Sequence, residues 1–582
     1  MNKKIKKGLA LILASLAFCG MFSGCGGFGD ASDESFNDRY TSEQKESMTE
    51  LKVGVYNGGI GYEWAKKMAV EFEEMYKDYP FETGKKGIYV NVVAEKEGYE
   101  QLNNLLAVGQ ETNDIYYLSA HAFKDYVDLD NNICLAKDVT EILQEKVYKD
   151  NGELAGAGET ATKSMLDKQE PYFAWAWNEG TETDPVYYAF PYEYCLKGFI
   201  YDHDAIGQFM DYDGWKGTPK TTDDFIDLLD RISDNYTGIT FAAQDSAASY
   251  THMFQYGFIA QYEGEEGAML NLTYDGECTF EANSFSADII AAEKAAGRMV
   301  ENADGTLTAT ITDENAYLLS QQTGKKKLAE FARNILKQEY IDSNIVGVSQ
   351  TYSEVQKGFL YSAADPTKKR IAMIFEGEWW ENEARTYFDA MARDIDEKYA
   401  YGERDFRFIP IPQAEGGVNK KYTMLTNGAG HAFVNKNTTV YEAAKKWIQF
   451  QHSEANLKLF LQQTGCTLPY EFNMSSSDLE KCSPFAASTY EMKQSDEFQI
   501  LHVNSEQPGL SDFARLTTLP MSGYGLQMRS KDAKDKGIDN LFKYMANNLS
   551  FSAESFMEGM AKIYNRQDWT DAYNTYKATV NK

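Results

Sequence analysis

Cysteine and histidine are scarce in this chain of 582 residues, which holds 7 of the first and 6 of the second. No two cysteines form a CxxC pair and the histidines lack zinc-site spacing, so we expect no metal and no cofactor. The 5 cysteines after residue 25 are an odd number, which excludes a complete disulfide framework. The sequence leaves open whether Cys466 and Cys482 form a disulfide bond or are two buried thiols.

Basic residues are also in short supply. There are 57 lysines and arginines against 88 aspartates and glutamates, and the formal net charge is −31. Nucleic-acid phosphates need a basic protein face, and anionic lipids attract basic segments, so this balance argues against both as partners. It suits a body that stays off its own membrane surface and binds a neutral or cationic ligand.

Long apolar runs are absent too. Gly8–Phe18 has only eleven residues, too short to span a bilayer, and it lies between four lysines and Ser23-Gly24-Cys25. This arrangement resembles the lipobox of bacterial lipoproteins, with Phe22 where most such boxes carry Leu. The resemblance implies a signal peptide over residues 1–24 and an acylated Cys25 that anchors the chain to the extracytoplasmic face of a cell membrane. An ordinary secretory signal is the alternative, and either interpretation exports the protein.

The segment after Cys25 is rich in Gly, Ser, Asp and Glu and poor in aliphatic side chains. Such a composition buries too little apolar surface to offset the entropy of ordering it. We therefore expect residues 25–50 to form a flexible tether. The globular body begins near Leu51 and is long enough for two domains.

Strands and helices alternate at the start of this body. Strand-like runs at 51–59, 88–94 and 114–120 are separated by helical spacing at 64–76 and 100–108. The order β-α-β-α-β predicts a mostly parallel sheet with helices on both faces and a cleft beyond the carboxyl ends of the strands.

Later segments repeat these signals. Strands are expected at 196–206, 370–380 and 430–436, and helices at 225–232 and 440–451. Three polar segments, near 141–185, 262–345 and 476–530, are interpreted as additions to a simpler two-lobed core, and their fold is left open.

Three stretches of the sequence carry a family resemblance. They are YYAFPYEYCLKGFIYDHDAI (187–206) with TPKTTDDFIDLL (218–229), RIAMIFEGEWWENEA (370–384), and FIPIPQAEGG (408–417) with TNGAGHAFVNKNTTVYEAAKKWIQFQHSEANLKLF (426–460). Together they resemble the extracellular solute-binding proteins of carbohydrate ABC transporters, family 1, of the maltodextrin-binding type. The chain departs from that pattern at Asp202-His203-Asp204, where Asn-Lys-Asp is usual, and at Thr222, where Trp is usual.

The resemblance implies an α/β, two-lobed periplasmic-binding-protein-like fold of type II, with hinged lobes that close on a ligand in the cleft between them. By analogy the chain crosses between lobes near 193–196 and near 426–430. That assigns 51–192 with 428–475 to the N-terminal lobe, and 193–427 with 476–582 to the C-terminal lobe. The family further implies a monomer that captures an oligosaccharide and delivers it to ABC transporter permease subunits.

A sugar site needs flat aromatic side chains for the C–H face of the ring and fixed polar groups for the hydroxyls. The resemblance places Trp379 at the family's Gly-x-Trp position, which implies that its ring stacks on the sugar. The alternative is that Trp379 packs in the core. The next residue, Trp380, is expected to pack inside. Other candidate ligand-binding residues follow the first and third strands, lie at the first crossing, or share one face of an extended segment: Tyr62, Trp64, Ser119, His121, Tyr192, Glu193, Tyr194, Trp175 and Trp177. Each has a structural alternative. Tyr62 and Trp64 could form a hydrophobic staple at the start of a helix, and Glu193 could accept a hydrogen bond from the backbone. Trp175 and Trp177 could pack in the core of an insertion.

Catalytic motifs are missing from the sequence. It has no Gly-x-Ser-x-Gly elbow, no His-Glu-x-x-His and no P-loop, so we expect a binding protein and no enzyme. Two alternatives stay open: a surface lipoprotein glycosidase or lyase, and a binder of the same fold that takes a peptide or polyamine.

Overall fold

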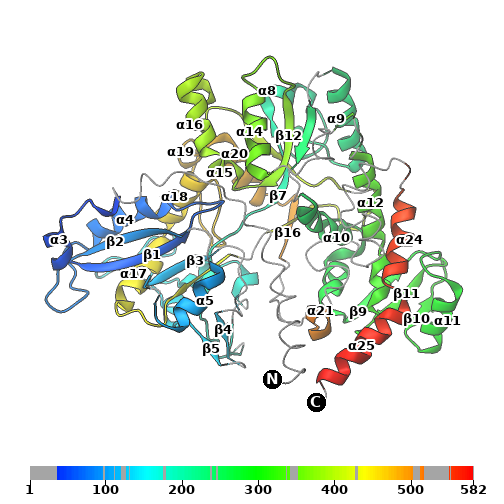
Figure 1. The fold of residues 1–582 in the computed structure, drawn as a ribbon, viewed down its shortest axis with the longest axis horizontal. Coiled ribbons are helices and arrows are strands. Elements are labelled where there is room, and N and C mark those ends of the chain that lie inside the picture. The colour runs from blue at the N-terminus through cyan, green and yellow to red at the C-terminus, as the bar shows by residue number, and fades with distance from the viewer. Residues whose placement is uncertain are drawn as a thin grey trace, which may run out of the picture. The chain divides into compact units, whose positions relative to one another are not determined.

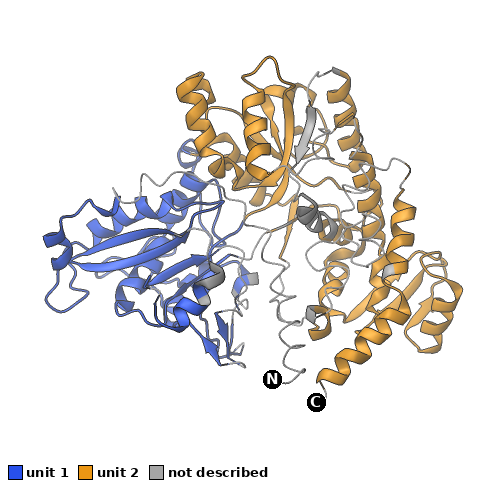
Figure 2. Cartoon of the chain, in the orientation of Figure 1, with its two compact units in different colours: residues 1–194, 428–481 blue, residues 195–427, 482–582 orange. Residues whose placement is uncertain are grey.

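A computed structural model describes most of the chain after residue 35. The described residues are 36–95, 99–110, 112–118, 123, 126–129, 132–174, 178–181, 183–235, 239–243, 247–335, 337, 339–340, 351–413, 415–426, 430–502, 511–516, 550 and 552–580. The chain forms two compact units: unit 1 is residues 1–194 with 428–481, and unit 2 is residues 195–427 with 482–582 (Figure 2). The backbone therefore passes from one unit to the other at 194/195, 427/428 and 481/482.

Unit 1 contains a five-stranded sheet in the order β2-β1-β3-β15-β6 (Figure 1). Its strands are β1 (Thr49–Tyr56), β2 (Ile88–Glu95), β3 (Ile115–Leu118), β6 (Phe190–Pro191) and β15 (His431–Val434). The first three are parallel as predicted, and β15 runs antiparallel to both β3 and β6. The main helices are α4 (Glu63–Met75), α5 (Tyr99–Ala107), α17 (Tyr441–Gln451) and α18 (Glu454–Thr464). Trp64, Phe72 and Trp447 are each at most 1% exposed and form the centre of this core.

Unit 2 contains a four-stranded sheet in the order β13-β7-β12-β8. Its strands are β7 (Lys197–Asp202), β8 (Ile239–Ala243), β12 (Ile371–Gly377) and β13 (Phe406–Ile409). Within this sheet the β12–β8 pair is parallel, and the β12–β7 and β13–β7 pairs are antiparallel. Every residue of β7 and β12 is buried, because helices cover the sheet. These helices include α9 (Thr222–Asn235), α12 (Thr323–Ile335), α14 (Tyr352–Ser362), α16 (Arg385–Asp394) and α20 (Pro484–Lys493).

The segments whose fold the sequence left open are built on smaller elements. In unit 2, β9 (Gly276–Phe280), β10 (Met299–Glu301) and β11 (Leu307–Ile311) form an antiparallel sheet beside α11 (Ala287–Ala295), α24 (Ala553–Ile563) and α25 (Arg566–Val580) (Figure 1). Trp569 of α25 is 3% exposed and belongs to the same buried cluster as the inward-facing residues of this sheet. The long helix α10 (Ala247–Thr273) is broken at Gly264, whose φ is 82°.

Shorter elements complete the two units. The paired strands are β4 (Val127–Asp128) with β5 (Ile133–Cys134), and β14 (Tyr422–Leu425) with β16 (Phe498–Leu501). The short helices are α3 (Ser42–Ser47), α6 (Thr140–Gln144), α7 (Met165–Lys168), η2 (Pro171–Ala174), α8 (His203–Ile206), η3 (Gly207–Phe209), η4 (Trp215–Gly217), η5 (Ala316–Gln321), α15 (Trp380–Glu383), η6 (Glu397–Tyr399), α19 (Ser476–Leu479) and α21 (Asp512–Leu516).

The tether predicted over residues 25–50 is wrong for its second half, which is folded onto unit 1. The Asn37 amide donates to the Val92 carbonyl at 3.0 Å and accepts from the Val92 N–H at 3.2 Å, so one side chain supplies both hydrogen bonds of a strand partner. Arg39 and Tyr40 both bind the buried carboxylate of Glu73. These contacts, with helix α3 and the start of β1, offset the ordering entropy that the composition alone does not.

Two further features follow from the described residues. None of their helices is long and apolar enough to cross a membrane. Five cysteines are present as thiols: Cys134, Cys195, Cys278, Cys466 and Cys482. The disulfide bond between Cys466 and Cys482, which the sequence left undecided, is therefore not formed.

Candidate functional site

Trp379 lies in unit 2 at the end of β12, where it caps the start of α15. Its ring rests against Gly377, since a Cβ built on that glycine would lie 2.5 Å from ring atoms Cη2 and Cζ2. Lys197, which faces Gly377 across the β7–β12 pair, has its Nζ 5.3 Å from the ring centroid. The indole therefore packs against the C-terminal end of the central strand β12 and is only partly buried.

The residue between this glycine and the tryptophan is fully buried. Glu378 Oε2 accepts hydrogen bonds from the Leu196 N–H at 2.8 Å and from Lys493 Nζ at 2.7 Å. Burial raises the pKa of the Glu378 carboxyl, and the Lys493 ammonium opposes that effect. Glu378 thus ties the turn that carries Trp379 to two other segments of unit 2.

Trp380 packs inside unit 2, as predicted, with no exposed surface. Its ring contacts the rings of Phe359, Phe388, Phe406 and Phe485. The two adjacent tryptophans therefore have different surroundings. Trp380 lies in the core, and Trp379 lies against the end of strand β12.

Trp64, predicted as a cleft residue, lies in the core of unit 1 at 1% exposure. Its indole N–H donates to the Gly61 carbonyl at 3.0 Å, and its ring contacts Tyr117, Tyr192 and Phe460. Packing accounts for this side chain, because its polar atom is bonded and its ring is enclosed. Tyr62 is the N-cap residue of α4 and is partly buried, with Lys66 Nζ 4.4 Å from its ring centroid.

The three residues predicted at the first crossing belong to unit 1 and are buried there. Tyr192, Glu193 and Tyr194 are 2%, 5% and 7% exposed. The Tyr192 N–H donates to the Gly430 carbonyl at 3.0 Å, and the Glu193 side chain fills the space beside the Gly430 α-carbon. The Tyr194 hydroxyl donates to Glu170 Oε1 at 3.1 Å.

Five predicted residues lie outside the described part of the chain: Cys25, Ser119, His121, Trp175 and Trp177. Their lipidation and ligand-binding roles stay predictions. Of the candidate set, the described residues with partly exposed aromatic rings are Trp379 in unit 2 and Tyr62 in unit 1.

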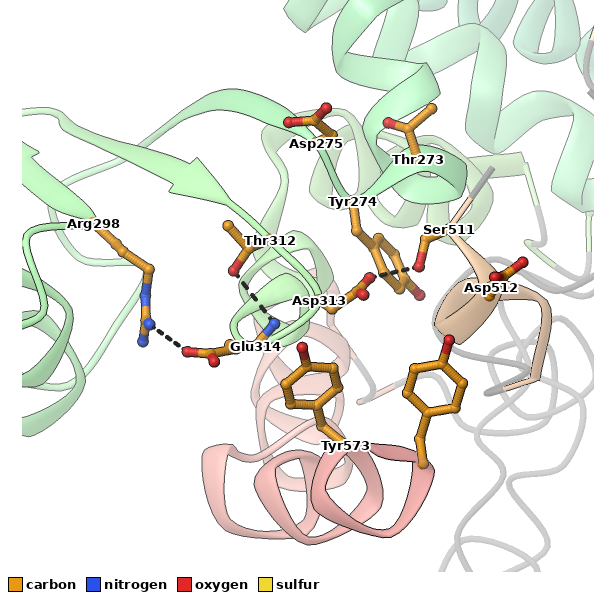
Figure 3. A pocket seen from close by; sticks show the side chains of 11 residues that line it. Thr273, Tyr274, Asp275, Arg298, Thr312, Asp313, Glu314, Ser511, Asp512 and Tyr573 are labelled. Carbon is orange, nitrogen blue, oxygen red and sulfur yellow. Dashed lines mark hydrogen bonds and ion pairs between the residues drawn. The ribbon is translucent and has the colours of Figure 1, made fainter. Parts of the chain in front are cut away.

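Unit 2 also carries a pocket that the sequence analysis missed, with a volume of about 550 Å³ (Figure 3). Tyr573 and Tyr576 of α25 form one wall, with ring centroids 6.3 Å apart. Asp313 accepts a hydrogen bond from Ser511 at 2.5 Å, and Arg298 pairs with Glu314 at 2.8 Å. The lining comes from residues 273–275, 298, 312–314, 511–512, 573 and 576. The i, i+3 tyrosine spacing was the one signal in the sequence, and it resembles ordinary helix packing.

The described residues contain no group of three or more His, Cys, Asp or Glu side chains placed to hold a metal ion.

Comparison with known proteins gives a fold. No family model matches the sequence, and no curated protein matches it. Apo RafE from Streptococcus pneumoniae matches the structure with a TM-score of 0.51 at 12% identity, covering 90% of this chain and 98% of that one. A probable secreted solute-binding lipoprotein from Streptomyces coelicolor matches with a TM-score of 0.51 at 11% identity, covering 88% and 98%. RafE in complex with raffinose gives 0.49 at 12% identity, with 89% and 100% covered. The chain thus has the predicted α/β fold of solute-binding proteins.

Proposed function

We propose that this chain, which has the fold of extracellular solute-binding proteins, binds an oligosaccharide and does no bond chemistry on it. The observation that carries the proposal is the placement of Trp379. Its ring rests on Gly377 at the end of a central strand, and part of its surface stays open for a sugar face. Among the proteins of this fold, RafE has been solved in complex with raffinose.

The setting of Trp379 favours stacking over simple core packing. A core tryptophan is enclosed on all sides, as Trp380 is, whereas Trp379 is enclosed by the sheet edge and the Lys197 side chain and is otherwise partly open. Lys197 is 4% exposed, and its Nζ lies over the ring at 5.3 Å from the centroid, so this cation contacts the aromatic face and stays out of the solvent. The partly exposed remainder of the indole is the apolar surface that the proposal assigns to a sugar.

The rest of the proposal concerns where the protein works. We propose that Cys25 is acylated, that the lipid holds the chain at the extracytoplasmic face of a cell membrane, and that the bound sugar passes to the permease subunits of an ABC transporter. The anchor follows from the lysine-rich, apolar and Ser-Gly-Cys start of the sequence. A monomer suffices for this task. The excess of 88 acidic over 57 basic residues keeps such a body away from anionic lipid headgroups.

A thermal-shift screen of the purified protein against oligosaccharides, peptides and polyamines tests the proposed function. We expect at least one oligosaccharide to raise the unfolding temperature in a concentration-dependent way, because a ligand that binds only the folded state stabilises it. Incubation with the same sugar should release no new reducing ends. Stabilisation by peptides or polyamines alone, or the appearance of new reducing ends, would replace this proposal with one of its alternatives.

A further inference from the structure

The ladder between β7 and β12 ends in an unusual way, just before Trp379. The last regular pair is Gly377 with Lys197. At the next step the Glu378 N–H donates to the Leu196 carbonyl at 3.0 Å, but the Leu196 N–H donates to the Glu378 carboxylate at 2.8 Å. In a regular antiparallel pair the backbone carbonyl would accept that bond. The Glu378 side chain takes its place, so the backbone is released to turn at Trp379 into α15.

A buried ion pair holds this carboxylate. Lys493 is the last residue of α20, and its Nζ lies 2.7 Å from Glu378 Oε2. The two side chains are 3% and 1% exposed. A buried carboxylate is costly unless it is paired and hydrogen-bonded, and Glu378 has both a cation and a backbone donor. We call this arrangement the Glu378 clamp; it consists of Glu378, Lys493 and the backbone of Leu196.

The clamp acts on the chain where it enters unit 2. Leu196 is the second residue of that unit after the passage at 194/195, and it also pairs with Thr426. On the other side of the passage, the Tyr194 carbonyl accepts from Thr467 Oγ1 at 3.2 Å within unit 1. Cys195 is the single residue between these two fixed points. Rotation of the backbone at this passage therefore falls mainly on the torsions around Cys195.

We infer that Glu378 is a positioning residue that couples the indole of Trp379 to the first passage between the units. Trp379 follows Glu378 directly, so a displacement of the indole by a ligand acts on the clamp, and through it on Leu196. Conversely, loss of the hydrogen bonds of the Glu378 clamp allows the indole to move away from Gly377 at the end of β12. This inference rests on the proposed function for the ligand, while the clamp itself is a property of the protein without ligand.

The experiment uses three variants of the full chain. Glu378→Ala removes the acceptor and the charge, and Glu378→Gln keeps an oxygen acceptor for the Leu196 N–H but removes the charge. Glu293→Gln is the matched control, because Glu293 of α11 has no exposed side-chain surface and pairs at 2.8 Å with Arg298, which follows that helix in the chain. All three lose a buried, ion-paired carboxylate, so a general loss of stability affects the control as well.

Two readouts need no ligand. The protein is labelled with 5-fluorotryptophan, the Trp379 resonance is assigned with Trp379→Phe, and hydrogen exchange is followed at the Leu196 amide. We expect both Glu378 variants to shift the Trp379 resonance, Glu378→Ala to raise Leu196 exchange by at least about tenfold, and Glu293→Gln to do neither. An unshifted resonance together with unchanged Leu196 exchange in the Glu378 variants would overturn the clamp. Glu378→Gln keeps the test valid if the alanine variant does not fold.

The third readout is the dissociation constant of an oligosaccharide found in the screen. We expect Glu378→Gln to raise it about tenfold, and its effect to be non-additive with that of Trp379→Ala, since both act on one contact. Unchanged affinity in a variant whose Trp379 resonance has moved would refute the coupling. If the wild type binds no carbohydrate, the proposed function fails, and the fluorine and exchange measurements still decide whether the clamp exists.

Discussion

Gly377→Ala gives the sharpest prediction about the candidate site. Gly377 has no positive φ, so its backbone tolerates alanine and the effect comes from the new methyl group alone. That methyl group would lie 2.5 Å from two ring atoms of Trp379 and 2.6 Å from a third, whereas ordinary contact begins at 3.4 Å. The indole must therefore move by about 1 Å or more away from the sheet edge.

After this displacement the face of the Trp379 indole no longer lies where a stacked sugar would contact it. We expect the variant to lose about 1–3 kcal/mol of binding free energy, the range for truncation of an important contact residue. Isothermal titration calorimetry with an oligosaccharide from the screen measures this loss. Tryptophan fluorescence of the free protein should change as well, because the ring leaves its support on the strand.

The control for this variant is Gly358→Ala in α14. Its new methyl group would meet only Ile371 Cδ1, at 3.5 Å, which is an ordinary contact. Alanine favours a helix interior by up to about 1 kcal/mol over glycine, so stability should hold or rise and binding should not change. Equal sugar affinities for wild type, Gly377→Ala and Gly358→Ala would refute the placement of Trp379 in the binding site.

Three further predictions concern the rest of the molecule. Lys325 is buried with its Nζ 2.8 Å from Asn271 Oδ1, and desolvation lowers its pKa to about 7, so the unfolded chain binds more protons between pH 7 and 10.5. Stability should rise with pH in that window by up to about 1.4 kcal/mol per unit, and Lys325→Met should flatten the pH dependence of the melting temperature; equal slopes would contradict this. Burial lowers the pKa of His452 to about 3 from 6.5, so stability should fall as pH drops through this range, and acid titration of His452→Gln should show a shallower fall than wild type. Asn37→Ala should raise hydrogen exchange at the Val92 amide, whereas unchanged exchange would show that the Asn37 contact is not maintained in solution.

Periodicity in the sequence predicted the central elements well. The strand runs at 51–59, 88–94 and 114–120 became β1, β2 and β3, and the helical spacing after Glu63 became α4. These signals are local, because the side chains of one strand or helix alternate with its own geometry. The inward packing of Trp380 was also predicted, and the structure places this buried residue at the start of α15.

Features that depend on distant residues escaped prediction. Asn37 bonds to Val92, 55 positions away, and Arg39 to Glu73, 34 positions away, so composition alone predicted a flexible tether where the chain is folded. The depth of Trp64 depends on Tyr192 and Phe460, which close over it from other parts of the chain.

The same limit applies within unit 2. The pocket beside α25 draws its lining from residues near 273, 313, 511 and 573, and no local pattern indicates that these segments meet. The bond from the Leu196 N–H to the Glu378 carboxylate spans 182 positions. The resemblance stated from the sequence singled out Trp379 as a candidate, but only the folded chain shows what supports its ring.

The most direct test of the account is a calorimetric titration of wild type and Trp379→Ala with the same oligosaccharide. If the sugar stacks on this indole, the alanine variant should bind it about 1–3 kcal/mol more weakly, while its melting temperature without ligand should fall less than that of Trp380→Ala, whose ring is fully buried. A sugar that binds wild type and Trp379→Ala with equal affinity would contradict the central claim.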